Sequence, residues 1–108
     1  MGSYEDDPKC LILTLSDIQK KIFWCAAIEC IKRDTSQTGP IEIKTFFGNL
    51  DISTAVVRTT LNRLIDKRIL QKEKGKLGKN GFAILSLPKR MLDEAKEIFA
   101  EFKALQSV

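Results

Sequence analysis

The chain has 108 residues, of which 44% are hydrophobic and 30% are charged, and this balance predicts one domain around a single core. The length excludes a multidomain enzyme, and the composition excludes a collagen-like or mostly disordered chain. No apolar run is long enough to cross a bilayer, and no secretion signal stands at the N-terminus. We therefore expect a cytoplasmic protein without membrane contact.

The positive charge is concentrated in one stretch of the chain. The formal net charge is +4, yet residues 53–90 carry ten Lys and Arg against two acidic residues. The segments on either side of this stretch are both net negative. A field polarised in this way suits a polyanionic partner.

The chain contains three cysteines, Cys10, Cys25 and Cys30, and no histidine. Because no His is present and the cysteines are not closely paired, we expect no metal site and no cofactor. The thiols are expected to be reduced, with the role of small apolar side chains. Histidine is the commonest general base, so its absence argues against an enzyme, and no catalytic residue is expected.

The N-terminal third of the chain predicts a tail, a short strand and a long helix. Residues 1–9 are polar and acidic, which is typical of a flexible tail, and residues 10–14 are expected to be extended. Ser16, with Gln19 three residues later, is typical of a helix N-cap, and the helix is expected to end near Arg33. Seven consecutive apolar residues within it surround the helix axis. The helix is therefore expected either to be central to the core or to share a face with a second subunit.

The middle of the chain predicts short elements followed by a second long helix. Residues 35–40 indicate a loop, residues 41–43 a short strand and residues 44–50 a brief helix. Ser53 is a second N-cap candidate, and it opens a helix over residues 53–67. The core-facing stripe of this helix is expected to follow helical spacing, at Val57, Leu61, Leu64 and Ile65.

The C-terminal part predicts a hairpin and a last helix. Strands are expected at 69–74 and 82–87, joined by a glycine- and lysine-rich tip at 75–81. Pro88 suits the first position of a helix. An apolar stripe from Met91 to Leu105 indicates that this helix is amphipathic.

The segment 52–64, ISTAVVRTTLNRL, with DKRIL at 66–70, resembles the recognition-helix region of winged helix-turn-helix proteins. The shared pattern is I-S-x-x-x-V-x-x-x-L-x-x-L, followed by a charged turn and an apolar pair. The segments 38–41 and 81–88 are similar to winged-helix proteins of bacterial plasmids and other mobile elements. One departure is Arg68, at a position where the family often has Gly, so the helix must end there without the residue best suited to a left-handed conformation.

The resemblance implies a mostly helical α+β fold, a winged helix-turn-helix with a three-helix core and a β-hairpin wing at residues 10–88. Residues 89–108 would add a C-terminal amphipathic helix for dimerisation. The implied function is sequence-specific binding of double-stranded DNA by a dimeric regulator of transcription. Helix 53–67 would lie in the major groove, and the basic wing 72–81 on the backbone or in the minor groove.

This function predicts three kinds of contact. Ser53 and Thr54, at the start of the helix, are expected at phosphates. Arg58, Thr59 and Asn62 are expected at base edges, because Arg can bind guanine, Asn adenine and Thr the thymine methyl group. Contacts to the DNA backbone or the minor groove are expected from the far end of the helix and from the wing, at Arg63, Lys67, Lys72, Lys74, Lys76, Lys79 and Asn80.

Several of these residues have structural interpretations as well. Ser53 caps its helix whether or not it contacts DNA, and Arg63 is placed to pair with Asp66. Lys72 and Lys74 alternate with polar residues, as in a solvated edge strand. The phenylalanines fall on apolar stripes, so the surface aromatics of single-strand binders are not expected.

Three functional alternatives and one assembly state follow. The first candidate is a transcriptional regulator, and the second is an accessory DNA-binding factor for plasmid replication, partition or conjugative transfer. The third, of another class, is a protein-interaction module on the same scaffold. A homodimer through the first long helix and the last helix is expected, because a two-fold dimer doubles the DNA contacts of one small domain.

Overall fold

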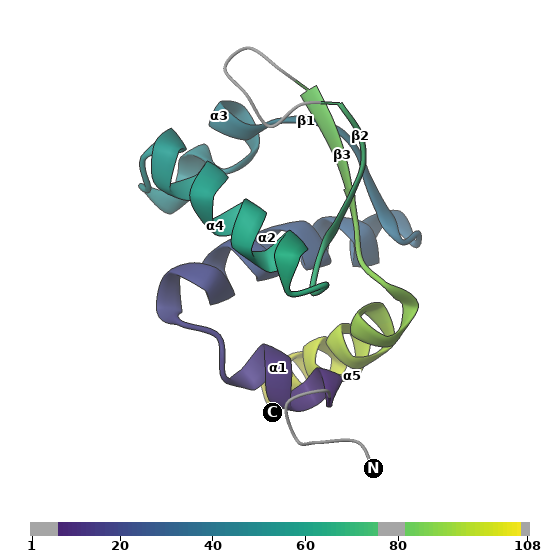
Figure 1. Cartoon of the computed structure of the whole chain (residues 1–108). Helices are drawn as coiled ribbons and strands as arrows, with labels where there is room; N and C mark the ends of the chain where they lie inside the picture. Colours follow the sequence, from purple (N-terminus) through teal and green to yellow (C-terminus); the bar gives the residue numbers. More distant parts are fainter. Residues whose placement is uncertain (1–6, 76–81, 107–108) are drawn as a thin grey trace.

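The described residues of this α+β protein form five α-helices, one 3₁₀ helix and a three-stranded antiparallel sheet (Figure 1). The computed structural model describes residues 7–75 and 82–106. In chain order the elements are α1 (Pro8–Leu13), α2 (Asp17–Arg33), β1 (Gln37–Glu42), α3 (Ile43–Phe46), η2 (Gly48–Leu50), α4 (Thr54–Asp66), β2 (Gln71–Gly75), β3 (Phe82–Ser86) and α5 (Lys89–Gln106).

Helix α2 confirms the predicted cap and length. The Ser16 hydroxyl accepts a hydrogen bond from the Gln19 N–H (3.3 Å), and the Gln19 side chain accepts one from the Ser16 N–H (3.2 Å). This reciprocal pair satisfies two N–H groups that a helix start leaves without partners. The helix ends at Asp34, which takes the left-handed conformation (φ 54°). Helix α2 is central to the core, because it contributes five fully buried residues: Ile22, Phe23, Ala26, Ala27 and Cys30.

The N-terminal strand prediction was wrong. Residues 8–13 form α1 because Asp7 accepts a hydrogen bond from the Lys9 N–H (3.0 Å) and Pro8 occupies a position where a missing N–H costs nothing. Ile12 is buried, and α1 packs against α5. Of the expected tail, residues 1–6 lie outside the described residues, whereas Pro8 and Lys9 belong to the helix.

Strand β1 begins earlier than expected, at Gln37 within the predicted loop. Gln37 pairs with Ser86 and Pro40 with Ile84, and an irregularity in register separates these two pairs. Proline is tolerated there because β1 is an edge strand of the order β1-β3-β2. At its other end, Ile43 starts α3 and does not continue the strand.

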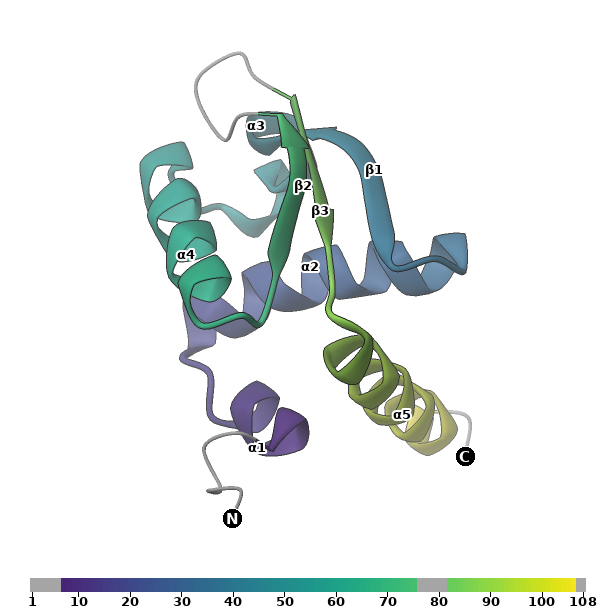
Figure 2. The ribbon, with the colours of Figure 1, turned by 45° about the vertical axis from the view of Figure 1, so that its right-hand side comes forward.

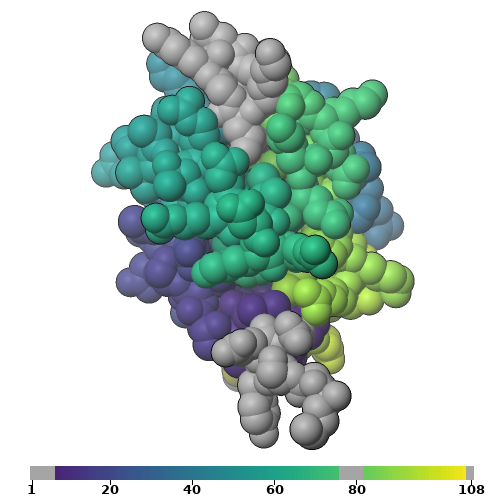
Figure 3. Space-filling model, in the orientation of Figure 1, coloured from purple at the N-terminus to yellow at the C-terminus, as the bar shows by residue number. Residues whose placement is uncertain are grey.

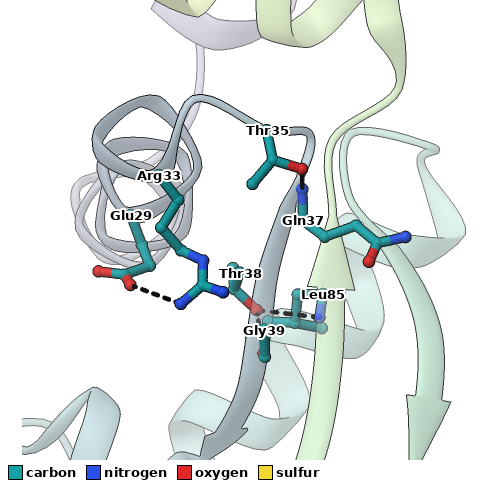
Figure 4. Close-up of polar contacts among 7 residues, drawn as sticks. All are labelled: Glu29, Arg33, Thr35, Gln37, Thr38, Gly39 and Leu85. Carbon is teal, nitrogen blue, oxygen red and sulfur yellow. Dashed lines mark hydrogen bonds and ion pairs between the residues drawn. The ribbon is translucent and has the colours of Figure 1, made fainter.

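Thr38 lies at this irregularity and is almost fully buried. Its hydroxyl accepts a hydrogen bond from the Leu85 N–H (3.2 Å) and donates one to the Gly39 carbonyl (2.8 Å), as Figure 4 shows for the Leu85 bond. The side chain thus replaces a backbone acceptor that the regular ladder would supply. Glu29 and Arg33, on the neighbouring turn of α2, form an ion pair at 4.0 Å that is partly exposed.

Strand β3 is central and β2 pairs with its other side, so β2 and β3 form the predicted hairpin. Gly75 ends β2 with φ +87°, and a Cβ atom there would collide with the carbonyl oxygen of Phe82. Only glycine fits this position. The rest of the predicted tip, residues 76–81, lies outside the described residues.

Helix α4 lies between the hairpin and the first turn of α2 (Figures 1 and 2). Val57, Leu61 and Leu64 are buried, as predicted, whereas Ile65 is only partly buried against the core. Thr60 joins the buried residues at 7% exposure. Together with α2, the inner face of the sheet and the first half of α5, they enclose one continuous core. Within residues 7–75 and 82–106, no helix has the length and apolar content needed to cross a membrane.

Candidate nucleic-acid interface

The solvent-facing side of α4 carries every helical residue that the sequence predicted for the interface. The set is exposed without exception: Ser53, Thr54, Arg58, Thr59, Asn62, Arg63 and Lys67. Arg58 and Asn62 are one turn apart and share one side of this face, whereas Thr59 and Arg63 share the side nearer α2. The helix therefore presents its polar side chains outward in two adjacent rows.

The start of α4 is capped as predicted. The Ser53 hydroxyl accepts a hydrogen bond from the Val56 N–H (3.3 Å), and Ser53 itself is extended. The N–H groups of Thr54 and Ala55 have no acceptor within the helix. Backbone donors and the positive end of the helix dipole thus lie together at an exposed helix start.

The basic side chains of this region are not neutralised within the described part of the chain. No described carboxylate lies within 4.0 Å of the charged groups of Arg58, Arg63, Lys67, Lys72 or Lys74. The pairing of Arg63 with Asp66 considered above is therefore not formed. Of the acidic residues nearby, Glu73 instead accepts a hydrogen bond from the Ser86 hydroxyl (2.6 Å).

The pairing of β2 with β3 is irregular at the wing lysines Lys72 and Lys74. Lys72 pairs with Leu85 and Lys74 with Ile84, because Glu73 is an extra residue between the two pairs. Successive residues of β3 point to opposite faces and paired residues share a face, so Lys72 and Lys74 lie on opposite faces of the sheet. Both are exposed. Lys76, Lys79 and Asn80 lie outside the described residues.

Helix α4 and the β2 edge of the sheet form one side of the molecule. In the space-filling view, the teal surface of α4 continues into the green surface of β2 without an intervening element (Figure 3). Over residues 54–75 this surface carries six Lys and Arg against two acidic residues. It is therefore a positively charged face that joins the helix to the hairpin.

A shallow groove borders this face, between the first turn of α2 and α4. It has a volume of about 370 Å³, and its lining is formed by Ser16, Ile18, Gln19, Ala55, Val56, Thr59, Thr60 and Arg63. Ile18 and Val56 are exposed apolar side chains at this groove. Sequence reasoning missed them, although Val56 stands off the core stripe of α4 and could have been identified on that ground.

Phe82 corrects the expectation that the phenylalanines lie in apolar stripes. It begins β3 beside the hairpin tip and is 59% exposed. The reason is its position: Phe82 alternates with the buried Ala83, so its side chain faces away from the core. It borders a second shallow groove beside β1, which Glu29, Arg33 and Glu42 also line.

Two of the cysteines, Cys25 and Cys30, are held in the protonated form. Burial, and to a lesser extent the nearby Glu29 carboxylate, raise the pKa of Cys25, and the same causes raise the pKa of Cys30 to about 11. Cys25 also donates a weak hydrogen bond to the Phe46 carbonyl, at 3.8 Å. No three His, Cys, Asp or Glu side chains gather into a metal-binding group in the described segments.

Comparisons with models of protein families, with curated proteins and with solved structures found no match to this chain.

Proposed function

We propose that this protein is a winged helix-turn-helix protein that binds double-stranded DNA by sequence. The observation that carries the proposal is the outward face of α4, where exposed Arg58, Asn62 and Arg63 have no carboxylate partner among the described residues. These basic residues form a positively charged cluster next to the hairpin. A cluster of this kind favours binding of a polyanion such as DNA.

The arrangement of α4 supports insertion into the major groove. A helix is about 10–12 Å across with its side chains, close to the width of that groove. Arg58 and Asn62 share one row of α4, so one bound orientation brings both to base edges. Thr59 lies in the adjacent row, where its methyl group can contact thymine.

The rest of the face supports contacts to the backbone. Ser53 and Thr54 stand at the capped helix start, where free N–H groups favour a phosphate. Arg63 and Lys67 lie farther along α4, and Lys72 and Lys74 extend the positive charge onto the hairpin. Because Lys72 and Lys74 lie on opposite faces of the sheet, a hairpin that sits over the DNA backbone can bring them to opposite sides of it.

Two roles remain compatible with this interface, and one class is disfavoured. A regulator of transcription and an accessory factor for plasmid replication, partition or transfer would use the same contacts, and the position of the bound site distinguishes them. A protein-interaction module has no need for unpaired Arg58, Arg63 and Lys67 on one face. We therefore place sequence-specific DNA binding, with the role of a transcriptional regulator, first.

The test is substitution of the two proposed base-reading residues. Arg58→Ala and Asn62→Ala should each lose roughly 1–3 kcal/mol of binding free energy on a duplex selected from a random pool, and should relax base preference at one position. Lys96→Ala is the matched control, since it removes an exposed positive charge on α5, far from α4 in the chain. Equal loss on selected and random duplexes would contradict base reading by these residues.

A further inference from the structure

The apolar stripe of α5 extends beyond the hydrophobic core of the protein. Its first half packs inward, with Met91, Leu92 and Ala95 buried. In its second half Phe102 is 56% exposed and Leu105 76% exposed, although they continue the same helical face. Figure 2 shows this end of α5 running away from the sheet. About half of the helix therefore presents apolar surface without a covering element among the described residues.

This surface is part of a groove between α5 and α2. Trp24 and Ile28 of α2 form one wall, and Ile98, Phe99 and Phe102 of α5 form the other, around a volume of about 290 Å³. Every lining side chain is apolar or aromatic. Trp24 contributes half-buried surface here, and its ring meets Phe23 edge to face at 5.3 Å. A groove with these walls suits an apolar helix face.

Charged side chains flank both walls. Asp17 on α2 lies one turn before Lys21, and the Lys103 Nζ on α5 lies 5.1 Å from the centre of the Phe99 ring. On α2, Lys21 and Lys32 lie on the same face as Trp24 and Ile28, at helical spacing. On α5, Glu101 lies three residues after Ile98 and four before Leu105, and Glu97 lies one turn before Glu101. A single copy leaves Lys21, Lys32, Glu97 and Glu101 without ion-pair partners among the described residues.

We propose that the groove binds the second half of α5 from another copy of this chain, in a symmetric exchange. Phe102 and Leu105 of each copy would pack on Trp24 and Ile28 of the other, while Glu97 and Glu101 approach Lys21 and Lys32. In a two-fold dimer the same surface patch occurs on both subunits, so the end of α5 from each copy can cover the groove of the other. An unrelated partner would have to match both the apolar groove and these four charged side chains, whereas the chain already carries an apolar helix face with acidic residues beside it. This assembly does not depend on the proposed DNA binding.

The first experiment measures the mass of the intact chain in solution. Sedimentation equilibrium at concentrations up to about 50 µM should give twice the chain mass of 12.2 kDa, and dilution should return the monomer. Trp24 is the only tryptophan, so its emission should shift to longer wavelength over the same dilution as the groove is exposed to water. A monomer mass throughout this range would overturn the proposal.

The second experiment tests the surface itself. Leu105→Glu should raise the dissociation constant at least about tenfold, because it places a charge in the apolar contact. Lys21→Glu and Glu101→Lys should each weaken the dimer, and the double variant should recover most of the loss. Phe82→Glu is the control, since this exposed apolar residue lies on the hairpin, outside the groove, and should leave the dimer unchanged.

Circular dichroism of each variant confirms that the fold is retained, which is expected because Leu105, Lys21 and Glu101 are exposed. A dimer that survives Leu105→Glu would place the contact elsewhere, as would a dimer that Phe82→Glu disrupts equally strongly. Failure of the charge exchange to restore binding would remove the proposed pairing of Lys21 with Glu101.

Discussion

Thr38 determines how β1 joins the sheet, because its hydroxyl supplies the acceptor that the irregular register removes. The Leu85 N–H on the central strand would otherwise be buried without a partner. The same hydroxyl donates to the Gly39 carbonyl and so fixes the chain just before Pro40. One polar side chain thus carries both hydrogen bonds at the irregularity within β1.

Thr38→Val tests this role, since it keeps the shape of the side chain and deletes both hydrogen bonds. We expect the free energy of unfolding to fall by about 1–3 kcal/mol, the cost of a buried unsatisfied donor. Thr35→Val is the matched control, because its hydroxyl accepts a long bond (3.4 Å) from Gln37 N–H in a solvated loop. Urea denaturation of both variants provides the measurement. Equal, small losses would show that Leu85 finds another acceptor.

Single residues also show what the sequence could and could not predict. Ser16 and Ser53 were identified as caps because a cap depends only on the residue and its next few neighbours. The register around Thr38 and Glu73 was not predicted, because it depends on which residue of β3 each one meets. The candidate contacts on α4 lie on the face that the helical period predicted. Lys72 and Lys74, two residues apart, would share one face of a regular strand, but the extra residue Glu73 places them on opposite faces.

At the scale of elements, α4 ends without the glycine that is common at the position of Arg68. Arg68 takes the left-handed conformation (φ 61°) and its N–H donates to the Ile65 carbonyl (3.0 Å). The Ile69 N–H donates to the Leu64 carbonyl (2.9 Å), and Ile69 is buried. These two bonds are those of a Schellman motif, which glycine usually completes. The helix therefore ends in a well-formed cap at the cost of backbone strain in Arg68.

Arg68→Gly should relieve this strain. A non-glycine residue in the left-handed region costs about 1–2 kcal/mol, and the larger entropy loss of glycine on folding offsets about half of that. We expect a net gain in unfolding free energy of roughly 0.5–1 kcal/mol by thermal or urea denaturation. Arg68→Ala is the control for loss of the exposed side chain, and it should stay near the parent value. A glycine variant no more stable than the alanine variant would contradict the strain.

The elements that were predicted correctly are those whose stability is mostly local. Helices α2 and α4 each have a serine cap and a long apolar pattern, and both extend over the expected residues. Helix α1 was mistaken for a strand because its six residues are too few to show a period, and its burial depends on α5. Strand β1 was shortened because Gly39 and Pro40 indicate a loop until the partner strand is known.

At the scale of the whole molecule, two surfaces of different chemistry lie on different elements. The basic face comprises α4 and the hairpin edge, and the apolar groove lies between α2 and α5. Helix α2 connects them, since its first turn borders α4 and its middle carries Trp24 and Ile28. In the proposed dimer, pairing through α2 and α5 would fix the distance between two copies of α4, and that distance would set the spacing of two DNA half-sites.

The most direct test of the proposed function is the affinity of the intact protein for a short DNA duplex, measured across a range of salt concentrations. The unpaired basic residues of α4 and β2 predict micromolar or tighter binding at about 50 mM salt. The logarithm of the association constant should then fall with the logarithm of salt concentration at a slope of about −4 or steeper. Absence of binding at about 50 mM salt, or a slope near zero, would contradict the account.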